Sequence, residues 1–350
     1  MGSVDVAVVA PNAPTTTIPV PTIPPHTEPR SLESQVNKGD RFFRIGSSAS
    51  GMAVLAIMVA VGLFLSIQAS QALEKTGFSF ITTADWQPDR GVFGIAAVIT
   101  GTVLIAFIAV LVAFPLAIGT ALFITEVAPP RLRSTLVALV DLMAAVPSVV
   151  YGLWGLFLFQ GHVIGLSRWI STWFGWIPIF DVAGANPHSP LSSASVFTAS
   201  GFIAGIVVAL MVMPIQCSVM REVFSQVPTG EREGAFALGS TRWGMIRIVS
   251  IPFGQGGIIG GTMLGLGRAL GETIAVVLII SPRFDINFNV LEAGSNSVSS
   301  LIALRYSEAS GFGLSALMAA GLALFAMTLA VNFAASVFIA RSRSGASSEA

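Results

Sequence analysis

The sequence predicts an all-α, polytopic membrane protein of about six transmembrane helices. Of its 350 residues, 53% are hydrophobic and only 10% are charged, and the mean hydropathy is +0.80. Soluble globular domains carry about 25% charged residues, so water is not the main solvent of this chain. A bilayer core about 30 Å thick needs about 20 consecutive apolar residues per helix. The stretches that meet this requirement are 47–68, 98–124, 135–159, 195–219, 257–281 and 313–340.

A Pro- and Thr-rich segment, from Pro11 to Arg30, precedes the first predicted span. Proline donates no backbone hydrogen bond, and so few large apolar side chains cannot form a core. We therefore expect a disordered cytoplasmic tail over 1–44, a transmembrane domain over 45–340 and a cytoplasmic C-terminal tail over 341–350. Cleavage of the first span as a signal peptide is the alternative, but the segment before it is far longer than the basic region that starts such peptides.

Charge and cysteine content exclude several function classes. The 18 basic and 18 acidic residues balance, and there is no basic run that could neutralise the phosphates of a nucleic acid. Cys217 is the single cysteine, so an internal disulfide cannot form, and the three histidines are far apart in the sequence. Because no cluster of nucleophilic or metal-ligating residues is recognisable, neither a catalytic residue nor a metal site is expected.

The distribution of basic residues predicts that both termini are cytoplasmic. In that orientation twelve of the eighteen Lys and Arg residues lie inside, five lie outside and Arg268 lies within a span, as the positive-inside rule favours. Four tryptophans fall in the outer segments: Trp86, Trp169, Trp173 and Trp176. An aromatic belt at the membrane interface is the preferred interpretation, and a docking surface for another protein is the alternative.

Segment 220–256, between the fourth and fifth spans, is expected to form two short cytoplasmic helices. Thr229 can cap the first helix, Gly239 can end it, and Ser240 or Thr241 can cap the second. Pro252 is expected to stop the second helix before the next span begins. A helical hairpin with exposed aromatic residues suits contact with another protein. An amphipathic connector lying on the lipid surface is the alternative.

A motif in this segment resembles the EAA loop of ABC importer permeases, which has the form E-A-A-x3-G-x9-I-x-L-P. The spacing is kept in full, with conservative replacements at three positions. The matching residues are Glu233, Gly234, Ala235, Gly239, Val249, Ile251 and Pro252. The resemblance implies a type I ABC importer permease fold, in which Glu233, Gly234, Ala235, Gly239 and Pro252 belong to the loop that couples to a separate cytoplasmic ATPase.

The sequence independently indicates that ATP is hydrolysed elsewhere. The lysine of a Walker A loop follows a glycine, because it must reach the β and γ phosphates. The only two lysines are Lys38 and Lys75, and neither follows glycine. We therefore expect a non-catalytic subunit that binds no cofactor itself, with ATP and Mg used by the partner ATPase.

The fifth predicted span contains two charged residues, Arg268 and Glu272, four positions apart. A continuous helix would place them on one face together with Gly261 and Gly265. Small residues also suit close contacts between helices, which is the role predicted for Gly261, Gly265 and Gly271. A charge within a membrane costs at least about 2.5 kcal/mol and is usually functional. Arg268 and Glu272 are therefore predicted to line a transport path, and a purely structural ion pair is the alternative.

Two stretches resemble motifs of phosphate-specific permeases of the PstC family. They are GLGRALGET, residues 265–273, and AVPSVVYG, residues 145–152. The likeness runs from about residue 41 to the C-terminus and is weakest over 181–193. It implies an ATP-driven importer of inorganic phosphate. The implied partners are a homologous PstA-like permease subunit, two PstB-like ATPase subunits and an extracytoplasmic PstS-like phosphate-binding protein, assembled in a bacterial plasma membrane.

Three further residues are weaker candidates for the translocation path: Ser148, Tyr151 and Asp141. Hydroxyl groups also satisfy backbone carbonyls, and Asp141 can reach the membrane interface, so structural roles remain open.

The cargo and the energy source have alternatives. An importer of sulfate, molybdate or phosphonate is one, because the coupling loop is shared among such systems. An ion-coupled secondary transporter is the other, although it needs no such loop and often has paired broken segments. No second copy of the GRALGE stretch is found here.

Overall fold

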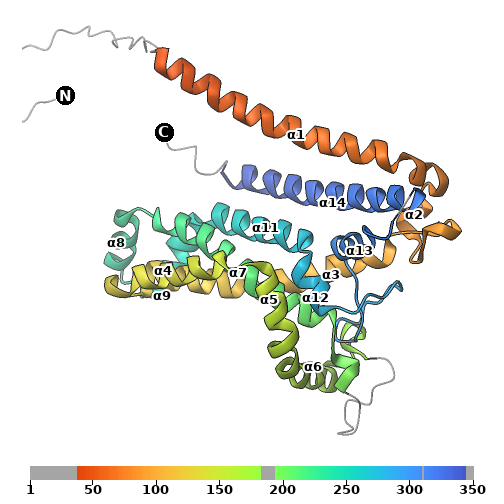
Figure 1. The fold of residues 1–350 in the computed structure, drawn as a ribbon. Coiled ribbons are helices and arrows are strands. Elements are labelled where there is room, and N and C mark those ends of the chain that lie inside the picture. The colour runs from red at the N-terminus through yellow and green to blue at the C-terminus, as the bar shows by residue number, and fades with distance from the viewer. Residues whose placement is uncertain (1–37, 183–193, 310, 344–350) are drawn as a thin grey trace, which may run out of the picture. The chain divides into compact units, whose positions relative to one another are not determined.

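The computed structural model describes residues 38–182, 194–309 and 311–343, and these residues are almost entirely helical (Figure 1). Most of the predicted N-terminal tail lies outside them, but residues 38–44 belong to helix α1 (Lys38–Thr76). That part of the tail prediction is wrong, because the helix extends beyond the apolar core of the span. The chain divides after Ala56 into two units. Helix α1 crosses this boundary, and the other features described below belong to the second unit.

Five helical stretches are long and apolar enough to cross a membrane in the described part of the chain, and a bent pair raises the number to six. The five are α1, α3 (Ala96–Leu122) with its extension η2 (Phe123–Val127), the run Ser148–Phe174, α7 (Gly201–Ser225) and α14 (Phe312–Arg343). The bent pair is Arg242–Phe253 and Gln255–Gly271, which meet at 69°.

The remaining elements either make up the run Ser148–Phe174 and the bent pair or connect the stretches. A two-stranded antiparallel hairpin consists of β1 (Trp86–Gln87) and β2 (Val92–Phe93). The short helices are α2 (Ser79–Thr82), η1 (Pro88–Arg90), α4 (Pro130–Ala145), α5 (Ser148–Trp154), η3 (Gly155–Phe159), α6 (Gln160–Phe174), η4 (Pro178–Phe180), η5 (Ala194–Phe197), α8 (Thr229–Ala237), α9 (Arg242–Met245), η6 (Ile246–Ser250), α10 (Ile251–Phe253), α11 (Gln255–Gly271), α12 (Ile274–Ile279) and α13 (Val298–Arg305).

The centre of the second unit is the contact between α3 and α7. Helix α3 presents a stripe of buried alanines at a spacing of three or four residues, which places them on one helix face: Ala106, Ala109, Ala113 and Ala117. Helix α7 packs against this region of α3 through Gly205, where an added Cβ would stand 2.6 Å from Cγ2 of Ile108. Small residues on both sides therefore let the two backbones approach closely.

We predict that Gly205→Ala destabilises the protein. The new methyl group overlaps Ile108, and overpacking of a close-packed core costs about 1–3 kcal/mol. Thermal unfolding of the detergent-solubilised chain should show a lower midpoint for this variant. Gly119→Ala in α3 is the matched control, because a Cβ there meets nothing within 4 Å. An equal midpoint for Gly205→Ala and the wild type would contradict the assigned packing.

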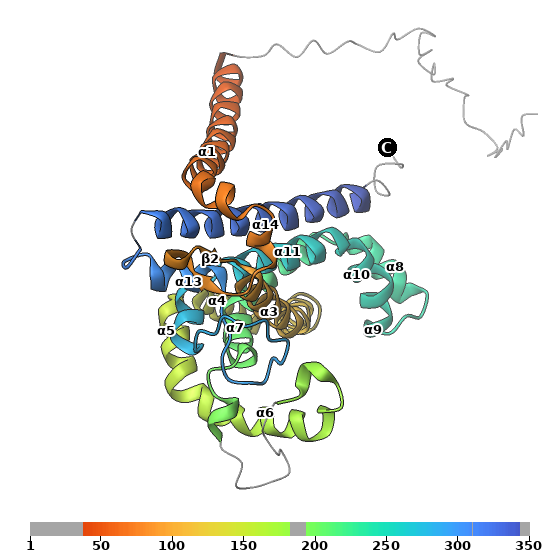
Figure 2. The ribbon, with the colours of Figure 1, turned by 90° about the vertical axis from the view of Figure 1, so that its right-hand side faces the viewer.

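The predicted third span, 135–159, is wrong because it crosses a helix break. Helix α4 ends at Ala145 and α5 begins at Ser148, with Val146 in an extended conformation. Pro147 disfavours a helical conformation in the residue before it, which ends α4 at this point. In Figure 2 helix α3 is seen end on, whereas α6 runs across the view, so the segment after the break leaves the direction of α3.

Candidate functional site

The helical hairpin that was predicted for segment 220–256 is present, as α8 and α9. Gly239 has a φ of 83°, a left-handed conformation that glycine adopts without steric cost, and it ends α8 as predicted. The Oγ1 of Thr241 accepts a hydrogen bond from the N–H of Gly244 at 3.1 Å and caps α9. The cap predicted at Thr229 is wrong, because Pro228 holds the N-cap position and Thr229 is the first helical residue.

The prediction that Pro252 stops the second helix is also wrong. The second helix does not stop there but runs from Arg242 to Phe253 and bends by 69° into α11 around Gly254. Residues Ile246–Ser250 form a π-helical turn within it. Proline donates no hydrogen bond and its ring crowds the carbonyl one turn earlier, so a widened turn accommodates it without ending the helix.

The residues of the EAA-like motif lie on an accessible surface of this hairpin. Glu233, Gly234, Gly239 and Pro252 are exposed and Ala235 is half-buried. The exposed apolar side chains beside them are Phe236, Leu238 and Trp243, and Leu238 is 90% exposed. Leu238 was missed by sequence reasoning, because its exposure depends on the turn at Gly239. Accessible apolar side chains on a polar hairpin are typical of a protein contact.

Arg268 and Glu272 do not share a helix face, so the predicted arrangement is wrong. Helix α11 ends at Gly271, and Glu272 has an extended backbone conformation. The four-residue spacing therefore no longer places the two side chains together. Arg268 is exposed, and no hydrogen bond or ion pair joins it to another residue in the described ranges. Glu272, in contrast, is only 9% exposed.

Glu272 instead stabilises the break between α11 and α12. Its Oε1 accepts a hydrogen bond from the N–H of Ala275 at 3.2 Å. Its carbonyl oxygen, which the helix leaves free, accepts one from the Oγ of Ser299 at 2.7 Å. Both bonds replace backbone pairing lost at the break, so the predicted span 257–281 is two helices joined at a fixed bend.

Two of the three glycines predicted for helix packing contact α7. An added Cβ on Gly261 would stand 3.2 Å from the carbonyl oxygen of Gln216, and one on Gly265 would collide with the Gln216 side chain. The prediction for Gly271 is wrong for the contacts within this chain, because Gly271 is exposed and a Cβ there meets nothing within 4 Å. The packed face of α11 also contains Leu270, which is buried in the core.

The two phosphate-permease-like stretches meet in the fold. A Cβ on Gly152, at the end of the first stretch, would stand 2.9 Å from the Cα of Ala275, just after the second. Tyr151 donates a hydrogen bond to the carbonyl oxygen of Met143 at 2.9 Å, which satisfies a backbone group freed at the end of α4. Asp141 is exposed and Ser148 is half-buried. No hydrogen bond or ion pair joins these three residues to Arg268 within the described ranges.

The loop between α12 and α13 is held by an arginine that the sequence did not single out. Arg283 donates to Glu292 at 2.8 Å and to Asp285 at 2.8 Å. The hydrogen bond that Arg283 donates to Glu292, followed by those that it donates to Asp285, raises the pKa of the Arg283 guanidinium above its ordinary value. This side chain therefore stays charged and fixes the loop that leads to Asn296 and α13.

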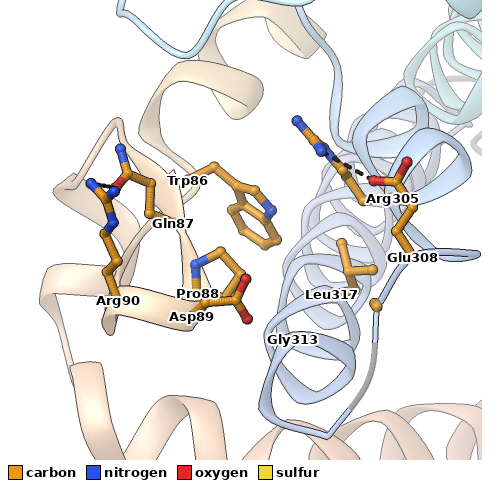
Figure 3. A pocket seen from close by; sticks show the side chains of 10 residues that line it. Trp86, Gln87, Pro88, Asp89, Arg90, Arg305, Glu308, Gly313 and Leu317 are labelled. Carbon is orange, nitrogen blue, oxygen red and sulfur yellow. Dashed lines mark hydrogen bonds and ion pairs between the residues drawn. The ribbon is translucent and has the colours of Figure 1, made fainter.

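A pocket of about 470 Å³ lies between the β1–η1 hairpin and the α13–α14 connection (Figure 3). Trp86 and Pro88 line one side, and Leu317 lies opposite them. Trp86 packs edge-on against Phe93 at 6.1 Å between ring centroids. Trp86 is half-buried in this pocket, whereas the other three tryptophans singled out from the sequence, Trp169, Trp173 and Trp176, are exposed.

Comparison with known proteins agrees with this architecture. Residues 113–344 match the family described as "Binding-protein-dependent transport system inner membrane component". The chain is 39% identical to the Phosphate transport system permease protein PstC of Pasteurella multocida, over 79% of this chain and 84% of that protein. It is 35% identical to Phosphate transport system permease protein PstC 2 of Mycobacterium bovis, over 85% of this chain and 91% of that protein.

The fold also resembles a chain in a crystal structure of a bacterial alginate ABC transporter with its alginate-bound periplasmic protein. The TM-score is 0.55 with 16% sequence identity, covering 87% of this chain and 96% of that one. At this identity the likeness supports the fold alone. Together, the apolar helices, the family match over residues 113–344 and the identity to the two permeases show that this chain belongs to the binding-protein-dependent transport system inner membrane component family.

Proposed function

We propose that this chain is the transmembrane permease subunit of an ATP-driven importer of inorganic phosphate. The observation that carries this proposal is the 39% identity, over 79% of the chain, to a phosphate transport system permease. The chain contributes the membrane path and does not catalyse ATP hydrolysis. Its partners are a homologous PstA-like permease subunit, two PstB-like ATPase subunits that use ATP and Mg, and an extracytoplasmic PstS-like phosphate-binding protein. Both termini face the cytoplasm.

The hairpin α8–α9 is the proposed contact with the ATPase. Its apolar side chains Phe236, Leu238 and Trp243 are exposed, and Glu233 lies among them as an exposed acid. A helix that binds in a groove on a partner protein typically contacts it through apolar side chains next to a charged residue.

Arg268 is the proposed phosphate-attracting residue of the path. It lies on an apolar helix, and nothing within the described ranges neutralises it. An unpaired charge at membrane depth requires compensation from a partner, water or a passing anion. The planar guanidinium can bind two phosphate oxygens at once. Transport requires this binding to be transient, so that the phosphate can leave the site. Ser148, Tyr151, Asp141 and Glu272 are then supporting residues, with Glu272 fixing the bend beside Arg268.

ATP-dependent uptake of labelled phosphate tests the proposed function. The complex is reconstituted in liposomes with its ATPase subunits and binding protein, and unlabelled sulfate, molybdate and phosphonate are added separately in excess. We expect uptake that none of the three competitors displaces. Displacement by one of them would identify another oxyanion as the cargo, and uptake driven by an ion gradient without ATP would refute the importer class.

A further inference from the structure

A buried carboxylate lies at the end of α3 that is closest to the hairpin. Glu126 belongs to the π-helical extension η2 (Phe123–Val127), and its side chain is only 4% exposed. Sequence reasoning did not identify it, because its partners are far away along the chain. A carboxylate that is removed from water needs such partners to remain charged at a tolerable cost.

The partners of Glu126 come from both parts of the cytoplasmic hairpin. The Nη2 of Arg232, in α8, lies 3.1 Å from its Oε1. The Oγ of Ser250, a fully buried residue at the end of η6, donates to the same oxygen at 3.1 Å. One carboxylate oxygen therefore joins α3 to the first helix of the hairpin and to the last turn before the bend at Gly254.

Arg232 extends this connection to the other central helix. Its Nη2 also donates to the carbonyl oxygen of Phe224 at 2.7 Å, near the end of α7. Because α3 and α7 pack against each other along the membrane domain, Arg232 holds α8 to the ends of both helices at the centre of the fold. The Nη2 of Arg232 makes both of these contacts, whereas its Nε is buried without a hydrogen-bond partner among the described residues.

We propose that Glu126 is the positioning residue that transmits motion of the α8–α9 hairpin to α3 and α7, through its bonds with Arg232 and Ser250. This inference rests on the proposed function, in which an ATPase moves that hairpin. A hairpin attached only through its flexible connections would shift without moving the membrane helices. A buried ionic bond is directional and costly to break, so displacement of α8 pulls the ends of α3 and α7.

The test measures phosphate transported per ATP hydrolysed by the reconstituted complex. Glu126→Gln and Arg232→Gln should each reduce this ratio by about tenfold, within the range of typical coupling energies. ATP hydrolysis should continue, but it should lose its dependence on the binding protein. The double variant should be no worse than either single variant, because all three remove the same connection. Glu231→Gln is the matched control, since Glu231 is an exposed acid on the same helix.

Two outcomes would overturn the proposal. One is a wild-type ratio in assembled Glu126→Gln, and the other is effects of the two single variants that multiply in the double variant. If Glu126→Gln fails to assemble, Ser250→Ala leaves the ion pair intact and removes one bond. A partial loss of the ratio is then expected, and an unchanged ratio contradicts the proposal.

A second measurement separates this inference from the proposed function. Amide hydrogen exchange of α8 in the membrane-embedded chain needs no cargo and no ATPase. Exchange over Thr229–Ala237 should be faster in Glu126→Gln than in the wild type and unchanged in Glu231→Gln. Equal exchange in all three would overturn the connection whatever the cargo is. A wild-type complex that does not transport phosphate would instead refute the proposed function alone.

Discussion

Arg268→Gln is expected to reduce phosphate uptake by about tenfold to a hundredfold, the range that corresponds to loss of a hydrogen bond to a charged group. Glutamine has a similar length but offers neither the positive charge nor the planar pair of donors. The structure strengthens this expectation, because Arg268 is exposed and makes no ion pair within the described residues. The substitution therefore removes no intramolecular bond in that part of the chain, and assembly should be retained.

Two further variants make the Arg268 experiment specific. Arg268→Lys keeps the charge and loses the two-pronged geometry, so intermediate uptake would indicate that both contribute. Arg44→Gln is the control for the same chemical change at an exposed position on α1. Uptake is measured on complexes whose copurification with the ATPase has been verified. Normal uptake by an assembled Arg268→Gln complex would remove this residue from the path.

Gly239→Val is expected to uncouple ATP hydrolysis from transport, lowering phosphate transported per ATP by about tenfold. The φ of Gly239 is 83°, and a β-branched residue is strongly disfavoured in that region. The turn between α8 and α9 must then change, which displaces Leu238 and the rest of the exposed contact surface. An unchanged ratio would count against the assigned coupling role.

Gly239→Asn separates backbone conformation from contact with the ATPase. Asparagine tolerates the left-handed region, and a Cβ at this position meets nothing within 4 Å of this chain. Coupling retained in Gly239→Asn but lost in Gly239→Val would show that only the conformation matters. Loss in both would show that the partner requires a bare backbone there. Gly230→Ala is the control, because Gly230 lies within α8 outside the EAA-like motif, is exposed, and a Cβ there meets nothing within 4 Å.

The membrane class and the α8–α9 hairpin could be predicted from the sequence because their signals are local. Apolar stretches of spanning length identify a membrane protein wherever they occur. The turn at Gly239 depends on that residue's own backbone freedom, and the cap at Thr241 depends on neighbours three positions away. Such short-range effects act before any tertiary contact is formed, so reading them needs no knowledge of the fold.

The helix breaks were harder to predict, because hydropathy does not report backbone direction. Pro147 marked the first break, yet the apolar residues on both sides read as one span. The second break, at Glu272, contains no proline, and it is stabilised by the Ser299 hydroxyl from another element. The sequence does not show this bond, so Arg268 and Glu272 are read as part of one continuous helix with both side chains on the same face. The predicted ion pair is wrong because the helix ends at Gly271.

The sequence by itself determined a polytopic membrane protein with a helical hairpin between two apolar spans and a charged residue, Arg268, on an apolar helix. Only the tertiary structure decided which charges meet. It separated Arg268 from Glu272 and paired Glu126 with Arg232. Ser250, which lies 124 positions from Glu126, donates a hydrogen bond to the same carboxylate. The physical reason is that spacing fixes neighbours only within a continuous helix, whereas a buried ion pair depends on how separate helices pack.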